Sequence, residues 1–166
     1  CMAEQLTPDL CIIGGGSAGL SIAAAAATLG APVVLIEKGR MGGECLNTGC
    51  VPSKALLAAA KRAALMRDSG AFGVTAQGVG IDFAKVHDHV HGVIAAIAPN
   101  DSSERFTGLG VRVIEGHAKF TDHWTVVVGD KFEIRARRFV IATGSTPAVP
   151  PIDGLDSGPY LTNDTI

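Results

Sequence analysis

The sequence predicts an α/β fold that combines a parallel sheet with a short antiparallel meander. Two apolar runs, 9–14 and 33–37, flank an alanine-rich stretch at 17–29, and this order of strand, helix and strand is a βαβ unit. A glycine-rich turn joins the first run to the helix. Five short β-branched runs between residues 111 and 142 are separated by Gly or Asp, which is typical of a meander that returns to a last buried strand.

Local sequence signals predict where helices begin and end in the first hundred or so residues. Gly30 is a good stop for the helix at 17–29, and the strand at 33–37 follows it. Residues 39–49 are rich in glycine and have no period, so we predict a loop there. Pro52 suits the first turn of a helix over 51–67. A second helical stretch is predicted over 81–98, before Pro99, with a short continuation over 102–109.

The second half of the chain is predicted to be mostly strand and then irregular. After Gly144 the chain is punctuated by prolines and glycines and has no hydrophobic period, which is typical of a linker. We therefore predict one domain over residues 1–146 and a linker over 147–166. The five predicted strands are 111–115, 118–121, 125–128, 132–135 and 138–142.

Composition excludes several classes of function. The 166 residues include 14 Lys and Arg against 16 Asp and Glu, and the net charge of −2 disfavours a nucleic-acid partner. An apolar content of 47% predicts a well-buried core. The longest weakly polar stretch, 20–27, is far short of the roughly 20 apolar residues that cross a bilayer, so no membrane segment is predicted. The N-terminus lacks a secretory signal, and we expect a cytoplasmic protein.

The turn at 14–19 matches the G-x-G-x-x-G pattern of dinucleotide-binding domains. Gly14 allows the tight turn, Gly16 lets the backbone approach a pyrophosphate, and Gly19 lets the helix pack closely on the strand. The helix N-terminus adds free N–H groups and a positive dipole end. Glu37, eighteen residues after Gly19, is placed to accept hydrogen bonds from ribose hydroxyls. FAD and NAD share this pattern, and the motif alone does not choose between them.

Cys45 and Cys50 stand five residues apart, at the start of the helix predicted over 51–67. A thiolate at a helix N-terminus is stabilised by the dipole and the unpaired N–H groups, which makes it a reactive redox group. Lys54, one turn later, adds positive charge on the same face. A zinc site would need more thiol or imidazole ligands nearby. The pair is therefore predicted to be redox-active.

These residues carry a resemblance to a known family. G-G-x-C-L-N-x-G-C-x-P-S-K at 42–54, after the glycine motif, resembles the FAD-dependent pyridine nucleotide-disulfide oxidoreductases, especially the dihydrolipoamide dehydrogenase and mercuric reductase branches. Residues 115–120 resemble the segment whose backbone meets the adenine, and residues 141–145 resemble the A-T-G turn that closes the FAD site. The resemblance covers essentially the whole chain. It implies a Rossmann-like FAD-binding domain over 1–146 and a linker over 147–166 toward an NAD(P)-binding domain.

The resemblance also implies a mechanism and its residues. Cys50 would face the flavin, Cys45 would be the interchange thiol, and Lys54 would stabilise negative charge on the reduced ring. NAD(P)H would be the co-substrate, and the acceptor would be a small disulfide, a lipoyl group or a metal ion. The parent enzyme would be a homodimer. Together with the glycine motif, the resemblance assigns these residues to the cofactor: Gly14, Gly16, Ser17, Ala18, Gly19, Glu37, Lys38, Gly43, Lys54, His117, Ala118, Ala142, Thr143 and Gly144.

Two features depart from the family pattern. Glu44 stands where many members have a threonine that helps to hold the cofactor phosphates, so no phosphate role is assigned to it. The family needs three domains and about 450 residues, of which this chain supplies about a third. We therefore expect the N-terminal FAD-binding portion of a dihydrolipoamide dehydrogenase-like enzyme. The alternatives are a mercuric reductase-like activity, a non-catalytic FAD-binding or redox module, and a plain NAD-binding domain.

Two further signals are assigned no chemistry. His87 and His91 are one turn apart on a predicted helix and could share an ion, but no carboxylate or cysteine is placed to complete the site. We therefore interpret them as a solvated or packed helix face and predict no metal site. Cys11 lies within the first strand, where it is expected to pack as a small hydrophobic residue.

Overall fold

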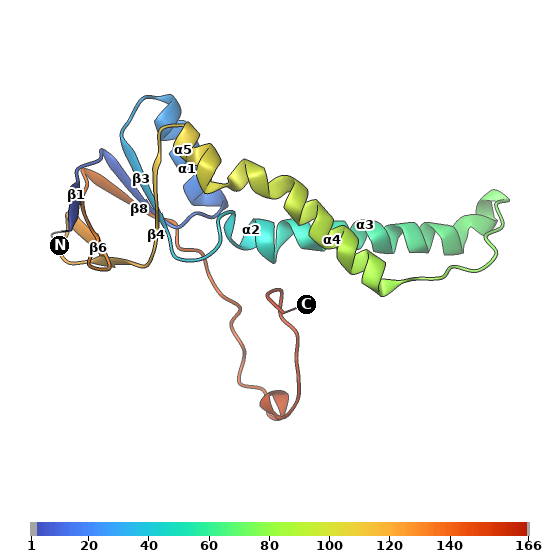
Figure 1. The fold of residues 1–166 in the computed structure, drawn as a ribbon. Helices are drawn as coiled ribbons and strands as arrows, with labels where there is room; N and C mark the ends of the chain where they lie inside the picture. The colour runs from blue at the N-terminus through green and yellow to red at the C-terminus, as the bar shows by residue number, and fades with distance from the viewer. Residues whose placement is uncertain (1–2, 166) are drawn as a thin grey trace.

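A computed structural model describes residues 3–165, and a parallel sheet forms its centre (Figure 1). The strand order is β4-β3-β2-β8, and all three pairings are parallel. The predicted parallel sheet is therefore confirmed. Its strands are β2 (Leu10–Ile13), β3 (Val33–Glu37), β4 (Arg112–Glu115) and β8 (Arg138–Ile141).

Helices cover one face of this sheet. The main one is α1 (Ser17–Thr28), and the short α5 (Ser103–Gly108) lies beside it. Ile12 and Leu35 point from the sheet into this layer, where they pack with Leu20 and Phe106. All four side chains are buried, and burial of such residues stabilises the layer by about 1.5–3 kcal/mol each.

A second sheet of order β1-β7-β6-β5 covers the opposite face. The meander was predicted, and β5, β6 and β7 are antiparallel as expected. The strand β1 was not predicted; it pairs in parallel with β7, so the sheet is mixed. Cys11 and Ile36 from the parallel sheet pack against Val126 and Ile134 of this sheet. The strands are β1 (Glu4–Leu6), β5 (Ala118–Phe120), β6 (Thr125–Val128) and β7 (Phe132–Arg135).

The crossover from β3 to β4 forms a helical hairpin that projects from the sheets (Figure 1). Here α3 (Cys50–Arg67) runs beside α4 (Phe83–Ile97), and the 3-10 turns Asp68–Phe72 and Ala98–Asp101 follow them. The structure corrects the predicted loop at 39–49, which contains the short helix α2 (Gly43–Asn47). The helix α4 begins later than predicted because the Asp82 side chain caps it by accepting from the Lys85 N–H.

The segment after β8 is irregular apart from a 3-10 turn at Leu155–Ser157. It loops away from the sheets and returns toward the hairpin, where Asn163 Nδ2 donates to Glu44 Oε1 at 3.0 Å (Figure 1). Among residues 3–165, no helix combines the length and the apolar character that a membrane crossing requires.

Candidate dinucleotide and dithiol site

Four segments that were predicted to bind a cofactor meet at the carboxyl ends of β2, β3, β4 and β8. This end of an open parallel sheet is where ligands of α/β domains bind. A cavity of about 60 Å³ lies there. It is lined by Ile13, Gly14, Ile36, Glu37, Lys38, Gly116, His117, Ala118 and Thr143. Six of the predicted residues therefore share one cavity: Gly14, Glu37, Lys38, His117, Ala118 and Thr143.

The turn between β2 and α1 is shaped by two close approaches. Gly14 has φ +111°, and a Cβ at this position would overlap the carbonyl oxygen of Ala142. A Cβ on Gly19 would overlap the carbonyl oxygen of Gly14. Only glycine fits at both positions. The structure thus shows the tight turn and the close packing of helix on strand that the motif predicts.

The N-terminus of α1 is open to an anion. Gly16 is the N-cap residue and has no side chain to cap the helix, and the first turn contains no acidic residue. The first N–H groups of a helix lack intrahelical partners. The predicted residues Ser17 and Ala18 thus present backbone donors at the positive end of the helix dipole.

Glu37 holds the glycine turn in place. One carboxylate oxygen accepts from the Gly15 N–H, and the other accepts from the Gly39 N–H at 2.6 Å. Each carboxylate oxygen can accept more than one hydrogen bond, so both retain capacity for ligand hydroxyls. The Glu37 carbonyl accepts from Gly116 at 2.8 Å, which places the segment with His117 and Ala118 beside it.

The predicted turn at 142–144 follows β8. The Ala142 N–H donates to the Ile13 carbonyl at 2.8 Å, and the Ala142 carbonyl faces Gly14. Gly144 has φ +69°, so the backbone turns away from the sheet there. Thr143, which stands between Ala142 and Gly144 in the sequence, lines the cavity.

The dithiol segment packs directly on the glycine turn. The Gly42 N–H donates to the Gly15 carbonyl at 2.9 Å. Gly43 has φ +57°, and a Cβ there would lie 2.7 Å from the Gly16 Cα. Because a side chain would push the two backbones apart, glycine at position 43 lets α2 sit against the N-terminus of α1.

The two thiols lie near each other at the α2–α3 junction. Cys45 lies in α2 and is half-buried, while Cys50 is the first residue of α3 and is exposed. A hydrogen bond with the Cys50 side chain, together with partial burial, raises the pKa of Cys45. The charge of Lys54 acts in the opposite direction. The structure therefore brings together the three residues predicted to carry the redox chemistry.

Sequence reasoning missed the contact of Glu44. The carboxylate of this exposed residue accepts from Asn163, 119 positions away. It also lies in the first turn of α2, where negative charge is favourable. No local pattern predicts such a pairing, because Asn163 stands in the irregular segment after β8.

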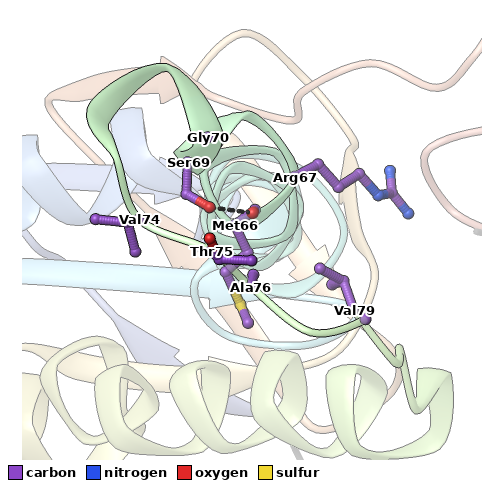
Figure 2. Close-up of a pocket in the computed structure, with 9 residues that line it drawn as sticks. Met66, Arg67, Ser69, Gly70, Val74, Thr75, Ala76 and Val79 are labelled. Carbon is purple, nitrogen blue, oxygen red and sulfur yellow. Dashed lines mark hydrogen bonds between the residues drawn. The ribbon is translucent and has the colours of Figure 1, made fainter.

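A separate cavity of about 380 Å³ is lined by the C-terminal end of α3 and the segment that follows it, residues 66–79 (Figure 2). Figure 2 shows Ser69 Oγ donating to the Met66 carbonyl, at 2.8 Å, on its rim. None of the predicted site residues lines it.

Cys11 supplies a contrast with the dithiol pair. Its side chain is buried in the core between the two sheets, and burial raises its pKa to about 12. Thiolates, not thiols, react with alkylating reagents. We expect iodoacetamide at pH 8 to label the exposed Cys50 of the reduced native protein first, to label Cys45 more slowly because its pKa is raised, and to leave Cys11 unlabelled, as read by peptide mass spectrometry. Labelling of Cys11 at a comparable rate before unfolding would contradict this expectation.

The chain was compared with known proteins. Residues 8–166 match the family model described as pyridine nucleotide-disulphide oxidoreductase. A mercuric reductase of Lysinibacillus sphaericus is 37% identical over 158 residues, which cover 95% of this chain and 29% of that enzyme. A dihydrolipoyl dehydrogenase of Geobacillus stearothermophilus is 38% identical over 143 residues, which cover 84% of this chain and 30% of that enzyme.

The fold of this chain also matches a solved structure. The HOCl-induced flavoprotein disulfide reductase RclA from Escherichia coli matches with a TM-score of 0.73 and 28% identity. The match covers 91% of this chain and 31% of that one. The chain thus spans about three tenths of the length of these three relatives.

Proposed function

The chain belongs to the pyridine nucleotide-disulphide oxidoreductase family, and from this premise we propose that it is the FAD-binding and dithiol portion of a disulfide oxidoreductase. Residues 1–146 would form part of an FAD-binding domain, and residues 147–166 a linker to an NAD(P)-binding domain. The observation that carries this proposal is the packing of Gly43 on Gly16, because it sets a dithiol beside a dinucleotide-binding turn.

The residues at the strand ends fit FAD. The uncapped N-terminus of α1, with Gly16, Ser17 and Ala18, would hold the pyrophosphate. Glu37 would accept from the ribose hydroxyls, with Lys38 beside it. Five further predicted contacts, His117, Ala118, Ala142, Thr143 and Gly144, line or adjoin the same cavity. The tight turn at Gly14 and the close packing of α1 on β2 at Gly19 support this arrangement, because they hold the N-terminus of α1 at the strand ends.

The dithiol would reduce the substrate by thiol–disulfide exchange. With Cys45 as the interchange thiol, its thiolate attacks one sulfur of a substrate disulfide and releases the other as a thiol. The Cys50 sulfur then attacks Cys45 in the mixed disulfide, which releases the second substrate thiol and leaves a Cys45–Cys50 disulfide. Bound FAD would supply the two electrons, taken from NAD(P)H, that restore both thiols. Lys54 would stabilise negative charge near the pair.

Dihydrolipoamide dehydrogenase-like activity is the proposed reaction, with a lipoyl group or another small disulfide as partner. Reduction of a metal ion such as Hg(II) is the second candidate. One observation favours it: alignments with four matched mercuric reductases cover 93–95% of this chain, whereas alignments with four matched dihydrolipoyl dehydrogenases cover 84–86%. In both cases we propose a homodimeric parent enzyme.

The test is substrate-dependent oxidation of NADH and NADPH by the full-length protein. We expect flavin absorption bands in the purified protein and rapid oxidation of one nucleotide with lipoamide. Faster turnover with thiol-chelated Hg(II) than with any disulfide would select the second candidate. A flavin-loaded protein that reduces neither acceptor, and whose dithiol stays oxidised with NADH or NADPH, would overturn the proposal in favour of a non-catalytic module.

A further inference from the structure

Two histidines on α4 meet outside the site described above. His87 and His91 are one helical turn apart, and both are exposed. Their Nε2 atoms lie 3.0 Å apart, and the ring centroids are separated by 4.2 Å with the planes tilted by 55°. His89 projects from another side of the helix, because residues two apart do not share a face. The pair therefore presents two ring nitrogens side by side.

This spacing fits two ligands of one metal ion. With metal–nitrogen bonds of about 2.0–2.1 Å, two ligands are about 2.9 Å apart at a right angle and about 3.3 Å apart at a tetrahedral angle. The observed 3.0 Å lies between these values. We propose that His87 and His91 form a binding site for a divalent d-block cation. Since both rings are exposed, water would fill the remaining coordination positions.

The chemistry of the two ligands selects the class of ion. Imidazole suits Cu(II), Ni(II) and Zn(II), whereas Mg²⁺ and Ca²⁺ require oxygen ligands. Within residues 3–165 no group of three or more His, Cys, Asp and Glu side chains is arranged around one point, so the site has two protein ligands. Cu(II) should bind most tightly of the three ions, as the Irving–Williams order states.

The surroundings of His91 favour a cation. His91 lines a cavity of about 570 Å³ between α4 and the loop after β3. Two acidic residues, Glu37 and Glu115, line the same cavity together with one basic residue, Arg40. Nearby carboxylates lower the energy of a bound positive ion.

The competing explanation is a hydrogen bond between two neutral rings. One Nε2–H would then donate to the other Nε2, which also accounts for a distance of 3.0 Å. For a metal to bind both rings, the donating ring takes the other tautomer, with its proton on Nδ1, so that both Nε2 atoms offer lone pairs to the ion. The two explanations differ in a measurable way, because the hydrogen bond alone gives no metal-dependent signal.

The experiment uses Cu(II) and the full-length protein with Cys45→Ser and Cys50→Ser, so that these thiols do not compete for the metal. We expect the electron paramagnetic resonance spectrum at one equivalent of Cu(II) to show hyperfine splitting from two equatorial nitrogens. His87→Ala and His91→Ala should each remove one nitrogen from the spectrum and weaken binding by about tenfold or more. His89→Ala is the matched control, on the same helix, and should bind as tightly as the parent.

A second measurement is the melting temperature of the protein with and without Zn(II). Zn(II) binds the folded site and should raise the melting temperature of the parent and of His89→Ala, with reversal by EDTA. His87→Ala should show no such rise. Equal Cu(II) spectra and equal affinities in the parent and in the His87 and His91 variants would overturn the proposal, and so would the absence of any bound Cu(II).

Discussion

Gly19→Ala is expected to destabilise the protein by about 3 kcal/mol, although the position is helical. Alanine normally stabilises a helix interior by about 0.5–1 kcal/mol relative to glycine. Here the added Cβ would overlap the carbonyl oxygen of Gly14, and the Ile12 side chain lies 3.4 Å from it. Because both neighbours belong to the strand and turn beneath the helix, α1 would have to move away from the parallel sheet.

Gly92→Ala is the matched control for this substitution. Gly92 lies inside α4, and a Cβ there would meet nothing within 4 Å. We expect this variant to be stabilised by the 0.5–1 kcal/mol that helix propensity predicts, or about that amount. Opposite signs for the two glycine-to-alanine changes would separate the effect of close packing from that of propensity.

The measurement is the urea midpoint of each variant, followed by far-ultraviolet circular dichroism. A second readout is the flavin content of the purified protein, since a displaced α1 would also displace the proposed pyrophosphate donors at Ser17 and Ala18. Gly19→Ala with an unchanged or higher midpoint would mean that the helix and the turn separate easily. The close packing would then not be what requires glycine at this position.

The parallel sheet could be predicted because its strands carry a strong local signal. The strand Val33–Glu37 has the bounds that were predicted, and its four apolar residues before Glu37 are buried alternately against the helical layer and against the second sheet. Such a strand needs no information from distant residues. The glycine motif likewise encodes a local turn, and the structure places Gly14 and Gly19 where the motif predicts.

Elements that depend on distant contacts could not be predicted. The strand Glu4–Leu6 has three residues and no apolar pattern, and it exists because β7 pairs with it from more than 120 residues away. The helix Gly43–Asn47 was hidden because it begins at Gly43, directly after its N-cap Gly42, and sequence reasoning assigns such glycines to loops. Its place depends on the contact between Gly43 and Gly16.

In the candidate site, too, some features could be predicted from local sequence and others could not. The spacing of Cys45, Cys50 and Lys54 could be interpreted from one helix start, and the structure brings all three together. The ring-to-ring distance of His87 and His91 could not be foreseen, since a helical spacing of four allows the rings to meet or to point apart. The sequence therefore predicts the spacing of the dithiol motif, but it does not predict the side-chain rotamers of the two histidines.

Cys50→Ser in the full-length protein is expected to reduce disulfide-dependent turnover by about three orders of magnitude or more, because residues that act as a unit fail together. Cys50 acts on the pKa of Cys45 and begins α3, and serine preserves the size and the helix start but cannot form a disulfide. Cys45→Ser should have the same effect. NADH- or NADPH-dependent reduction of a one-electron dye by the proposed flavin should survive in both variants, since it does not pass through the dithiol.

Cys11→Ala separates a general effect of losing a cysteine from loss of the dithiol. Cys11 is buried in the core and its thiol stays protonated, with a pKa of about 12, so it cannot take part in exchange at neutral pH. We expect this variant to lose some stability and to keep disulfide turnover. If Cys50→Ser kept both dye reduction and disulfide turnover, the electrons would reach the substrate without the Cys45–Cys50 pair. If it lost both, the substitution would have damaged the cofactor site, which lies against the same segment through Gly43 and Gly16.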